Sequence, residues 1–341
     1  MIPLSEEIVT IEDLKKFFVT KQGTVRAVDT VSFSVNQGET MGLVGESGSG
    51  KTTVAHTVVG IYEPTEGRIF FKGRSISKVF SERPKTLKGE IRIVFQDPGS
   101  SLNPRRSIKQ ILEVPLKVHR ICNNRDTMER VMELLRMVEL PPEEYMYKSP
   151  QAIGGGERQM GAIARALASD PSFVVLDEPT SALDVSVQAK IISLLMQLQQ
   201  DLNLTYLFIT HDLSLMRNIA SRVAIMYLGK ICEVAPTVEF FQDPFHPYTK
   251  MLLSSIPTVS DTEENLKPKE VVSTGEIPSP VNVPPGCSFH LRCPEKMEIC
   301  SQVDPRMVEI KEGHLVRCHL PFPMTQSKTS SGSGLGDRGM I

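Results

Sequence analysis

The sequence lacks a strong net charge, a long hydrophobic run and a secretory signal. Its 38 basic and 40 acidic residues leave a formal net charge of −2, so electrostatics gives no reason to expect nucleic acid as a partner. No apolar stretch approaches the roughly 18 residues that suggest a membrane-spanning helix. The N-terminus has no basic region followed by an apolar one. These absences favour a cytoplasmic chain without a membrane anchor of its own.

Cysteine is also scarce, with six residues in a chain of 341. In cytosolic proteins such cysteines are more often free or metal-bound than disulfide-linked. The apolar share of 40% and the charged share of 23% are ordinary for a globular protein. The length allows one large domain and a smaller one.

Strand and helix patterns alternate over residues 1–255. Short apolar strands end in polar residues at "SFVVLDEP" and "TYLFITHD", and an amphipathic helix lies between them. This alternation predicts an α/β fold with a mostly parallel sheet, a β-rich N-terminal subdomain and a helical subdomain at about 100–165. One helix there places four residues on a single face, which we interpret as core packing: Val131, Leu134, Leu135 and Val138.

The composition changes after about residue 256. The stretch "GEIPSPVNVPPGCSFHLRCP" is dense in proline, glycine and cysteine, which predicts a small irregular module over 256–322 that does not continue the sheet. The low-complexity end, residues 323–341, is predicted to be disordered.

A phosphate-binding loop is the clearest motif. The stretch "GLVGESGSGKTT" fits the pattern G-x-x-x-x-G-K-[ST] between a strand and a helix. Small residues let backbone amides surround a β-phosphate, a lysine reaches the β- and γ-phosphates, and a threonine hydroxyl binds Mg²⁺. The predicted nucleotide contacts are Gly45, Glu46, Ser47, Gly48, Ser49, Gly50, Lys51, Thr52 and Thr53.

Polar residues at three further strand ends complete the predicted site. Asp177 is placed to hold Mg²⁺, and Glu178, the next residue, is the predicted general base for an attacking water. Gln96 is expected to contact Mg²⁺ or that water, and His211 to contact the γ-phosphate.

Taken in order, the motifs "GESGSGKTT", "VFQDP", "IGGGE", "VVLDEPTSALD" and "ITHD" resemble the ATP-binding cassette family of transport ATPases. The resemblance spans about residues 9–255. It implies an ATPase that uses ATP and Mg²⁺, with Gln96 as the Q-loop glutamine, Asp184 in the D-loop and His211 as the switch histidine. It also implies that Phe18, or the adjacent Phe17, stacks on adenine.

Further stretches, including "DPFHPYTKMLLSSIP" and the proline–cysteine segment, resemble the ATP-binding subunits of dipeptide and oligopeptide importers. That resemblance implies peptide uptake, with oligosaccharide or nickel as other cargoes of relatives. It also implies a peripheral position on the cytoplasmic face of the cell membrane. The implied partners are two membrane permease subunits, a second ATPase and, indirectly, an extracellular solute-binding protein.

The glycine-rich loop departs from the family's "LSGGQ" signature, which binds the γ-phosphate of ATP held by the opposite subunit. Here Gly154 replaces a serine and Glu157 a glutamine, while Gly155 and Gly156 keep their place. Losing a hydrogen bond to a charged group costs roughly 1.5–3 kcal/mol, so weakening by one or two decades is expected. This favours a heterodimer over a homodimer. The alternatives are a non-hydrolysing regulatory subunit and a cassette ATPase of DNA repair or translation.

Four cysteines fall close together in the C-terminal module, at intervals that fit no C-x₂-C metal motif. Resemblance to the importer subunits implies that they hold a four-iron, four-sulfur cluster, with zinc or free thiols as alternatives. They are Cys287, Cys293, Cys300 and Cys318.

Overall fold

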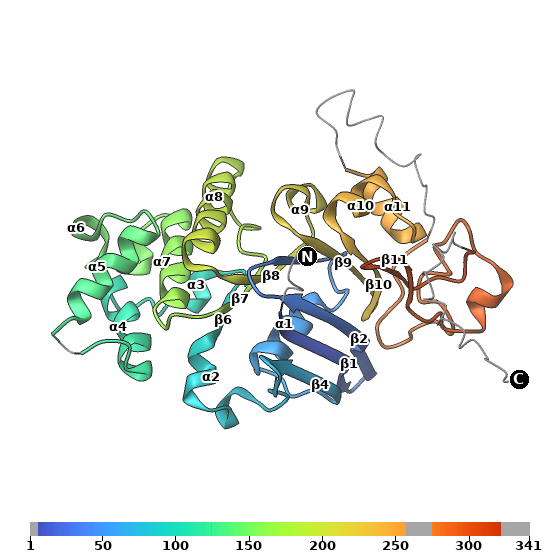
Figure 1. The fold of residues 1–341 in the computed structure, drawn as a ribbon, viewed down its shortest axis with the longest axis horizontal. Coiled ribbons are helices and arrows are strands. Elements are labelled where there is room, and N and C mark those ends of the chain that lie inside the picture. The colour runs from blue at the N-terminus through green and yellow to red at the C-terminus, as the bar shows by residue number, and fades with distance from the viewer. Residues whose placement is uncertain (1–5, 124, 257–274, 322–341) are drawn as a thin grey trace, which may run out of the picture.

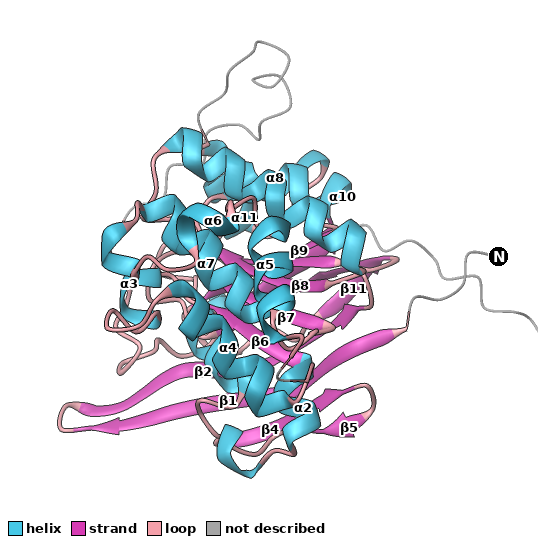
Figure 2. Ribbon diagram, turned by 90° about the vertical axis from the view of Figure 1, so that its left-hand side faces the viewer, coloured by secondary structure: helices cyan, strands magenta, loops and turns pink. Residues whose placement is uncertain are grey.

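Two β-sheets and a helical subdomain make up the part of the chain that the computed structural model describes, residues 6–123, 125–256 and 275–321 (Figure 1). The predicted disordered tail at 323–341 lies outside these ranges. Figure 2 shows helices covering one face of the larger sheet, with the smaller sheet on its other side. The predicted α/β architecture is confirmed.

The larger sheet has the strand order β11-β12-β10-β9-β3-β8-β7-β6 in the described residues. Its β9-β3-β8-β7-β6 part is parallel. These strands are continuous apolar runs because both of their faces are covered. Their bounds are β3 (Thr40–Val44), β6 (Ile91–Val94), β7 (Phe173–Asp177), β8 (Thr205–Thr210), β9 (Arg222–Tyr227), β10 (Lys230–Pro236), β11 (Val308–Lys311) and β12 (His314–Val316).

The smaller sheet is antiparallel, with the order β2-β1-β4-β5. Helix α1 (Lys51–Val59) lies between the two sheets, because its Val54 packs in one core with Leu14 of the smaller sheet and Leu43 of the larger. The bounds are β1 (Glu7–Thr20), β2 (Gly23–Asn36), β4 (Glu66–Phe71) and β5 (Arg74–Ser75).

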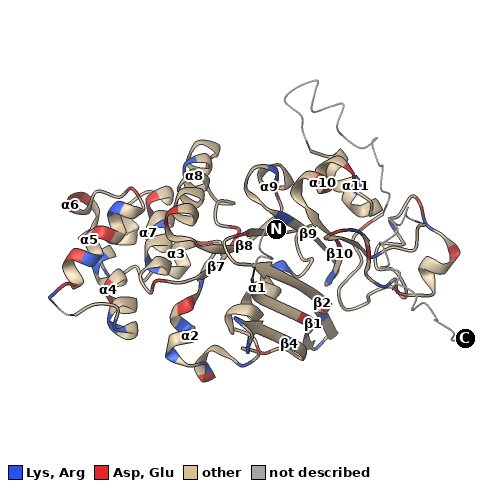
Figure 3. Cartoon of the chain, viewed as in Figure 1, with Lys and Arg blue, Asp and Glu red and all other residues tan. Residues whose placement is uncertain are grey.

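The predicted helical subdomain is present, and its charged residues of both signs are interspersed (Figure 3). The predicted apolar stripe of α5 is buried, with Val138 just beyond the helix end. None of the helices in the described ranges combines the length and apolar character that a membrane crossing requires. The bounds are α2 (Lys85–Glu90), α3 (Pro98–Ser101), α4 (Ile108–His119), α5 (Thr127–Met137), α6 (Pro142–Tyr145), α7 (Gly155–Leu167), α8 (Val185–Leu202), α9 (Leu213–Ile219), α10 (Thr237–Gln242) and α11 (Pro247–Ser254).

Part of the C-terminal module joins the larger sheet. Residues 275–297 are irregular, as predicted, but the hairpin β11–β12 pairs with β10 through Glu233 and Val316. The prediction that the module does not continue the sheet is therefore wrong. The buried His314 supplies the reason, because its Nε2 lies 2.7 Å from a carboxylate oxygen of the buried Glu233. That carboxylate also accepts hydrogen bonds from the backbone amides of Phe245 and His246.

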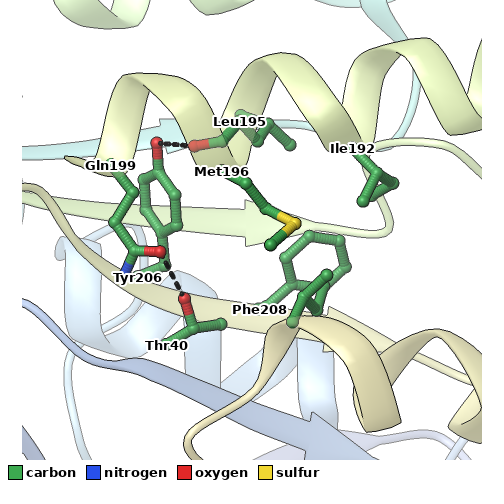
Figure 4. A pocket seen from close by; sticks show the side chains of 8 residues that line it. Thr40, Ile192, Leu195, Met196, Gln199, Tyr206 and Phe208 are labelled. Carbon is green, nitrogen blue, oxygen red and sulfur yellow. Dashed lines mark hydrogen bonds between the residues drawn. The ribbon is translucent and has the colours of Figure 1, made fainter. Parts of the chain in front are cut away.

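A small hollow lies where α8 and α9 pack on the larger sheet (Figure 4). Its volume of about 10 Å³ holds at most about one water molecule. Two hydrogen bonds border it, from Thr40 Oγ1 to Gln199 Oε1 and from Tyr206 Oη to Leu195 O. The hollow is a packing detail and is too small for a nucleotide.

Candidate nucleotide-binding site

The phosphate loop connects β3 to α1 and has room only for glycine at two positions. A Cβ on Gly45 would lie 2.1 Å from Met226 O, and one on Gly50 would lie 2.1 Å from Ala27 O. Gly50 also has φ of 109° and begins α1 without a side-chain cap. The first amides of α1 therefore remain available to an anion.

Two polar side chains of the loop, Lys51 and Ser49, are placed where they could bind phosphate. The buried Lys51 donates from Nζ to Gly45 O at 2.7 Å and to Glu46 O at 3.0 Å. The pKa of Lys51 is lowered overall, because the effect of burial exceeds the opposing effect of the nearby charges of Glu178, Asp177 and Glu46. Ser49 Oγ is buried and has no hydrogen-bond partner among the residues that the structure describes. An orphaned hydroxyl and uncapped amides are what a phosphate would satisfy.

The remaining predicted loop residues lie where a ligand could reach them. Ser47, Gly48 and Thr52 are exposed, and Thr53 is half-buried in the first turn of α1. Thr53 O accepts a hydrogen bond from Thr57 Oγ1 at 2.7 Å.

Thr52 and Asp177 place two oxygen atoms side by side that could both bind a metal ion. Thr52 Oγ1 donates to Asp177 Oδ1 at 3.1 Å, and His56 Nε2 lies 3.9 Å from the other carboxylate oxygen. Asp177 is only 3% exposed. Burial raises its pKa to about 6; the Thr52 hydrogen bond lowers this pKa, and the Glu178 charge raises it. A hydroxyl beside a carboxylate suits Mg²⁺, which prefers oxygen ligands.

Glu178 follows β7, and its carboxylate is held by residues that follow the two strands on either side, β6 and β8. Its Oε2 accepts from Gln96 Nε2 at 3.1 Å, and its Oε1 lies 3.4 Å from His211 Nδ1. The backbone of Glu178 is left-handed, with φ of 46°, and its amide donates to Ile209 O at 3.0 Å. Such a conformation persists only where surrounding contacts impose it. The braced carboxylate is placed to accept a proton from water.

The structure thus brings six predicted residues into one site at the carboxyl ends of β3, β8, β7 and β6. These strands are neighbours, so the loops that follow them meet. The six residues are Lys51, Thr52, Gln96, Asp177, Glu178 and His211.

The glycine triplet lies elsewhere, at the start of α7 in the helical subdomain (Figure 1). Cβ atoms on Gly155 and Gly156 would contact Leu183 and Val187, not the phosphate loop. A Cβ on Gly154 would lie 2.4 Å from Glu157 Oε2. The Glu157 carboxylate therefore lies against the position that a serine Cβ at 154 would take, and it would have to turn away if serine stood there.

Phe18 belongs to an aromatic cluster. Its ring meets Tyr62 edge-on at 5.2 Å, and Lys16 Nζ lies 5.1 Å from it. Tyr62 also contacts His56, the neighbour of Asp177, at 5.4 Å. Phe17 instead lies against Arg26. The adenine contact stays a prediction for Phe18, and the sequence reasoning missed Tyr62, which follows α1 closely.

Asp184 caps helix α8. Its Oδ1 accepts from Ser186 Oγ at 2.7 Å and from Val187 N at 3.0 Å. The Ser186 hydrogen bond and then the Val187 amide lower the pKa of Asp184. Its predicted nucleotide contact remains untested.

The sequence reasoning also missed two residues that bind Glu46. Tyr248 Oη accepts from Glu46 N and donates to Glu46 Oε2, both at 3.2 Å. Arg292 donates to the two carboxylate oxygens at 2.9 and 3.3 Å. No local signal could have found these contacts, because they join residues more than 200 positions apart.

The four C-terminal cysteines gather in one module. The pKa of Cys287 is raised to about 11 and that of Cys293 to about 12. Burial is the main cause in both, and the charges of Cys318 and Cys300 contribute to the increase. The pKa of Cys232 in β10 is also raised well above its ordinary value. Burial is the main cause, and the nearby Cys287 and Cys318 contribute to the increase. Across the described ranges, however, no group of His, Cys, Asp and Glu side chains is placed to hold a metal ion. The metal site here stays a prediction.

Comparison with known proteins places the chain among transport proteins. Residues 28–181 match the family described as ABC transporter, and residues 232–300 match the oligopeptide/dipeptide transporter C-terminal region. The oligopeptide transport ATP-binding protein AppF of Bacillus subtilis is 46% identical over 323 residues, 92% of this chain and 98% of that protein. The dipeptide transport ATP-binding protein DppF of Haemophilus influenzae is 43% identical over 311 residues, 89% of this chain and 94% of that protein.

Solved structures support the same fold. The cassette MJ0796, in a dimeric post-hydrolysis state bound to ADP and Pi, is similar with a TM-score of 0.60 at 26% identity. It covers 67% of this chain and 98% of its own. CbiO1 of Clostridium perfringens has a TM-score of 0.61 at 28% identity, covering 70% of this chain and 92% of its own.

Replacing Asp177 tests the effect of its burial. In an acid whose folded pKa is raised, ionisation destabilises the fold above that pKa, and the penalty disappears below the unfolded pKa of about 3.9. Without nucleotide, Asp177→Asn should therefore stabilise the protein by about 1–3 kcal/mol above pH 6 and by nearly nothing below pH 4. Urea unfolding across this pH range measures the difference. A gain of equal size at every pH would contradict the assignment.

Proposed function

The chain belongs to the ABC transporter family, and we propose that it is the ATP-hydrolysing subunit of an importer of oligopeptides or dipeptides. The geometry that carries the ATPase assignment is the Glu178 carboxylate, braced by Gln96 and His211 beside the Thr52–Asp177 pair. The peptide assignment rests on the two relatives' names and on the match at 232–300.

Each residue of the site has a defined task with Mg-ATP. The loop amides and Lys51 would bind phosphate oxygens, and Thr52 and Asp177 would hold Mg²⁺. Bound Mg²⁺ offsets negative charge on the phosphates. Glu178 accepts a proton from the attacking water, while Gln96 and His211 hold its two oxygens in place.

Membrane permease subunits and a solute-binding protein are the partners that this family membership implies. The chain acts as a peripheral subunit at the cytoplasmic face of the membrane.

We further propose that the second ATPase subunit is a different chain. The loop at 154–157 presents the Glu157 carboxylate at the start of α7, where a triphosphate from the opposite subunit would lie. Negative charge there opposes phosphate and counteracts the helix N-terminus. The phosphate loop and Glu178 of this chain keep their full set of groups, so a partner with an ordinary signature would let this chain's ATP be hydrolysed.

We propose that the four C-terminal cysteines, of which Cys300 is buried and the others are half-buried, are the ligands of a [4Fe–4S] cluster. Their thiols lie close enough to raise one another's pKa, but they would have to draw closer to bind it, because no group of the described side chains is placed to hold a metal ion. Purification without oxygen should give a brown protein that contains iron and sulfide and whose visible absorbance bleaches on reduction. Replacing Cys293 by Ser should remove the colour, whereas Cys122→Ser should not. A colourless protein that contains zinc would rule the cluster out.

The ATPase assignment is tested by steady-state Mg-ATP hydrolysis with a permease complex or a partner ATPase supplied. Glu178→Gln should lower turnover by at least about a hundredfold, because it removes the proton acceptor, and should leave ATP binding intact. Lys51→Ala should lose binding as well. Undiminished turnover of Glu178→Gln would reject Glu178 as the base.

A further inference from the structure

The phosphate loop is attached to the C-terminal module through Glu46. Arg292, from that module, forms a two-pronged ion pair with the Glu46 carboxylate. The Arg292 side chain is 10% exposed and that of Glu46 26% exposed. Tyr248 of α11, which is fully buried, holds both the amide and the carboxylate of Glu46. Such a two-pronged pair fixes orientation as well as charge.

The position of Arg292 is itself imposed by packing. Its guanidinium lies 5.8 Å from the centre of the Tyr227 ring and 5.9 Å from that of Phe289. These rings contact each other and Tyr248. Burial is the largest single influence on the pKa of Arg292 and lowers it, but the hydrogen bonds and charges of Glu46 and Tyr227 together outweigh burial, so the net pKa is raised. The arginine is therefore a fixed positive charge beside the loop.

Glu46 lies where its charge matters for phosphate. Its carbonyl accepts from Lys51 Nζ at 3.0 Å and from Ser49 N at 3.2 Å, and its carboxylate is close enough to raise the pKa of Lys51. An uncompensated carboxylate at this place would repel a polyphosphate.

We propose that Arg292 is a positioning residue for ATP binding, which acts by cancelling the Glu46 charge and holding the entrance of the phosphate loop. The inference rests on the proposed function, that this loop binds ATP. Through Arg292, the C-terminal module contributes to ATP binding at the phosphate loop.

The same geometry links the thiols to the nucleotide. Arg292 stands between Cys287 and Cys293, and its amide donates to Phe289 O at 2.9 Å within the same turn. A change in the thiols that shifted this turn would also shift the backbone that carries Arg292.

A double-mutant cycle on the full chain tests the proposal by equilibrium ATP binding. Arg292→Met should weaken ATP binding about tenfold at low salt and less at high salt, because it exposes the phosphates to the Glu46 charge. Glu46→Gln should bind ATP more tightly than wild type, because it removes the carboxylate that opposes phosphate. The double variant should return to within about twofold of Glu46→Gln. Arg292→Lys, which keeps the charge, should retain most of the affinity.

Lys311→Met is the control. Lys311 lies on β11 of the same module, where it pairs with Asp243 at 2.5 Å. It should lower stability without changing ATP affinity. Steady-state hydrolysis should show the Arg292→Met effect in KM with kcat nearly unchanged.

Several results would overturn the inference. An equal loss from Arg292→Met with Glu46 and with Gln at 46 would mean that Arg292 acts on ATP independently of Glu46, which contradicts the inference. Equal losses from the Lys and Met variants would exclude charge as the cause, and this comparison still decides if the Met variant is unstable. ATP binding by Arg292→Met as tight as wild type would reject the inference alone, whereas a wild-type chain that binds no ATP would reject the proposed function as well.

Discussion

The site depends on one constraint, the meeting of four parallel strand ends at one edge of the larger sheet. The strands β3, β8, β7 and β6 are neighbours in this order, and each delivers a polar group where its apolar run stops. Hydrogen bonds then join the groups across strands, from Thr52 to Asp177 and from Gln96 to Glu178. The buried core holds the strands in register, so it also sets the distances in the site.

Local physics explains each unusual feature of this edge. Glycine is required at 45 and 50 because backbone oxygens leave no room for a Cβ. Glu178 adopts a left-handed backbone while its side chain is held from both sides. Burial raises the pKa of Asp177 to about 6, a cost that a bound cation would offset. The glycine loop at this edge therefore suits a phosphate group, and Asp177 suits the metal ion that accompanies it.

Motifs with fixed local spacing were predictable from sequence, and contacts across long loops were not. The phosphate loop, the acid pair, Gln96 and His211 follow from strand ends and a short pattern, and the structure brings these residues together. The Tyr248–Glu46 and Arg292–Glu46 contacts span 202 and 246 positions, and no periodicity encodes such pairs. The hairpin β11–β12 was missed for the same reason, since it depends on the buried His314 and Glu233. The roles of Phe18 and Asp184 remain predictions.

Two halves of the machinery lie apart within one chain, the phosphate loop before α1 and the signature loop before α7 (Figure 1). The central claim is that this chain's phosphate loop is competent and its signature is weakened by Gly154 and Glu157. Both positions are restored together in the test below, because Glu157 Oε2 lies next to the place of a Cβ at 154 and its charge would stay at the start of α7 if Gly154 alone were changed.

The most direct test mixes wild-type protein with a triple variant that carries Lys51→Ala, Gly154→Ser and Glu157→Gln. In the mixed dimer, the wild-type phosphate loop faces a restored signature, while the variant binds no ATP of its own. Mg-ATP turnover of the mixture should exceed that of wild type alone by about tenfold or more. Glu178→Gln in the chain that keeps Lys51, the one that binds ATP, should abolish this gain. A mixture no faster than wild type alone would contradict the account.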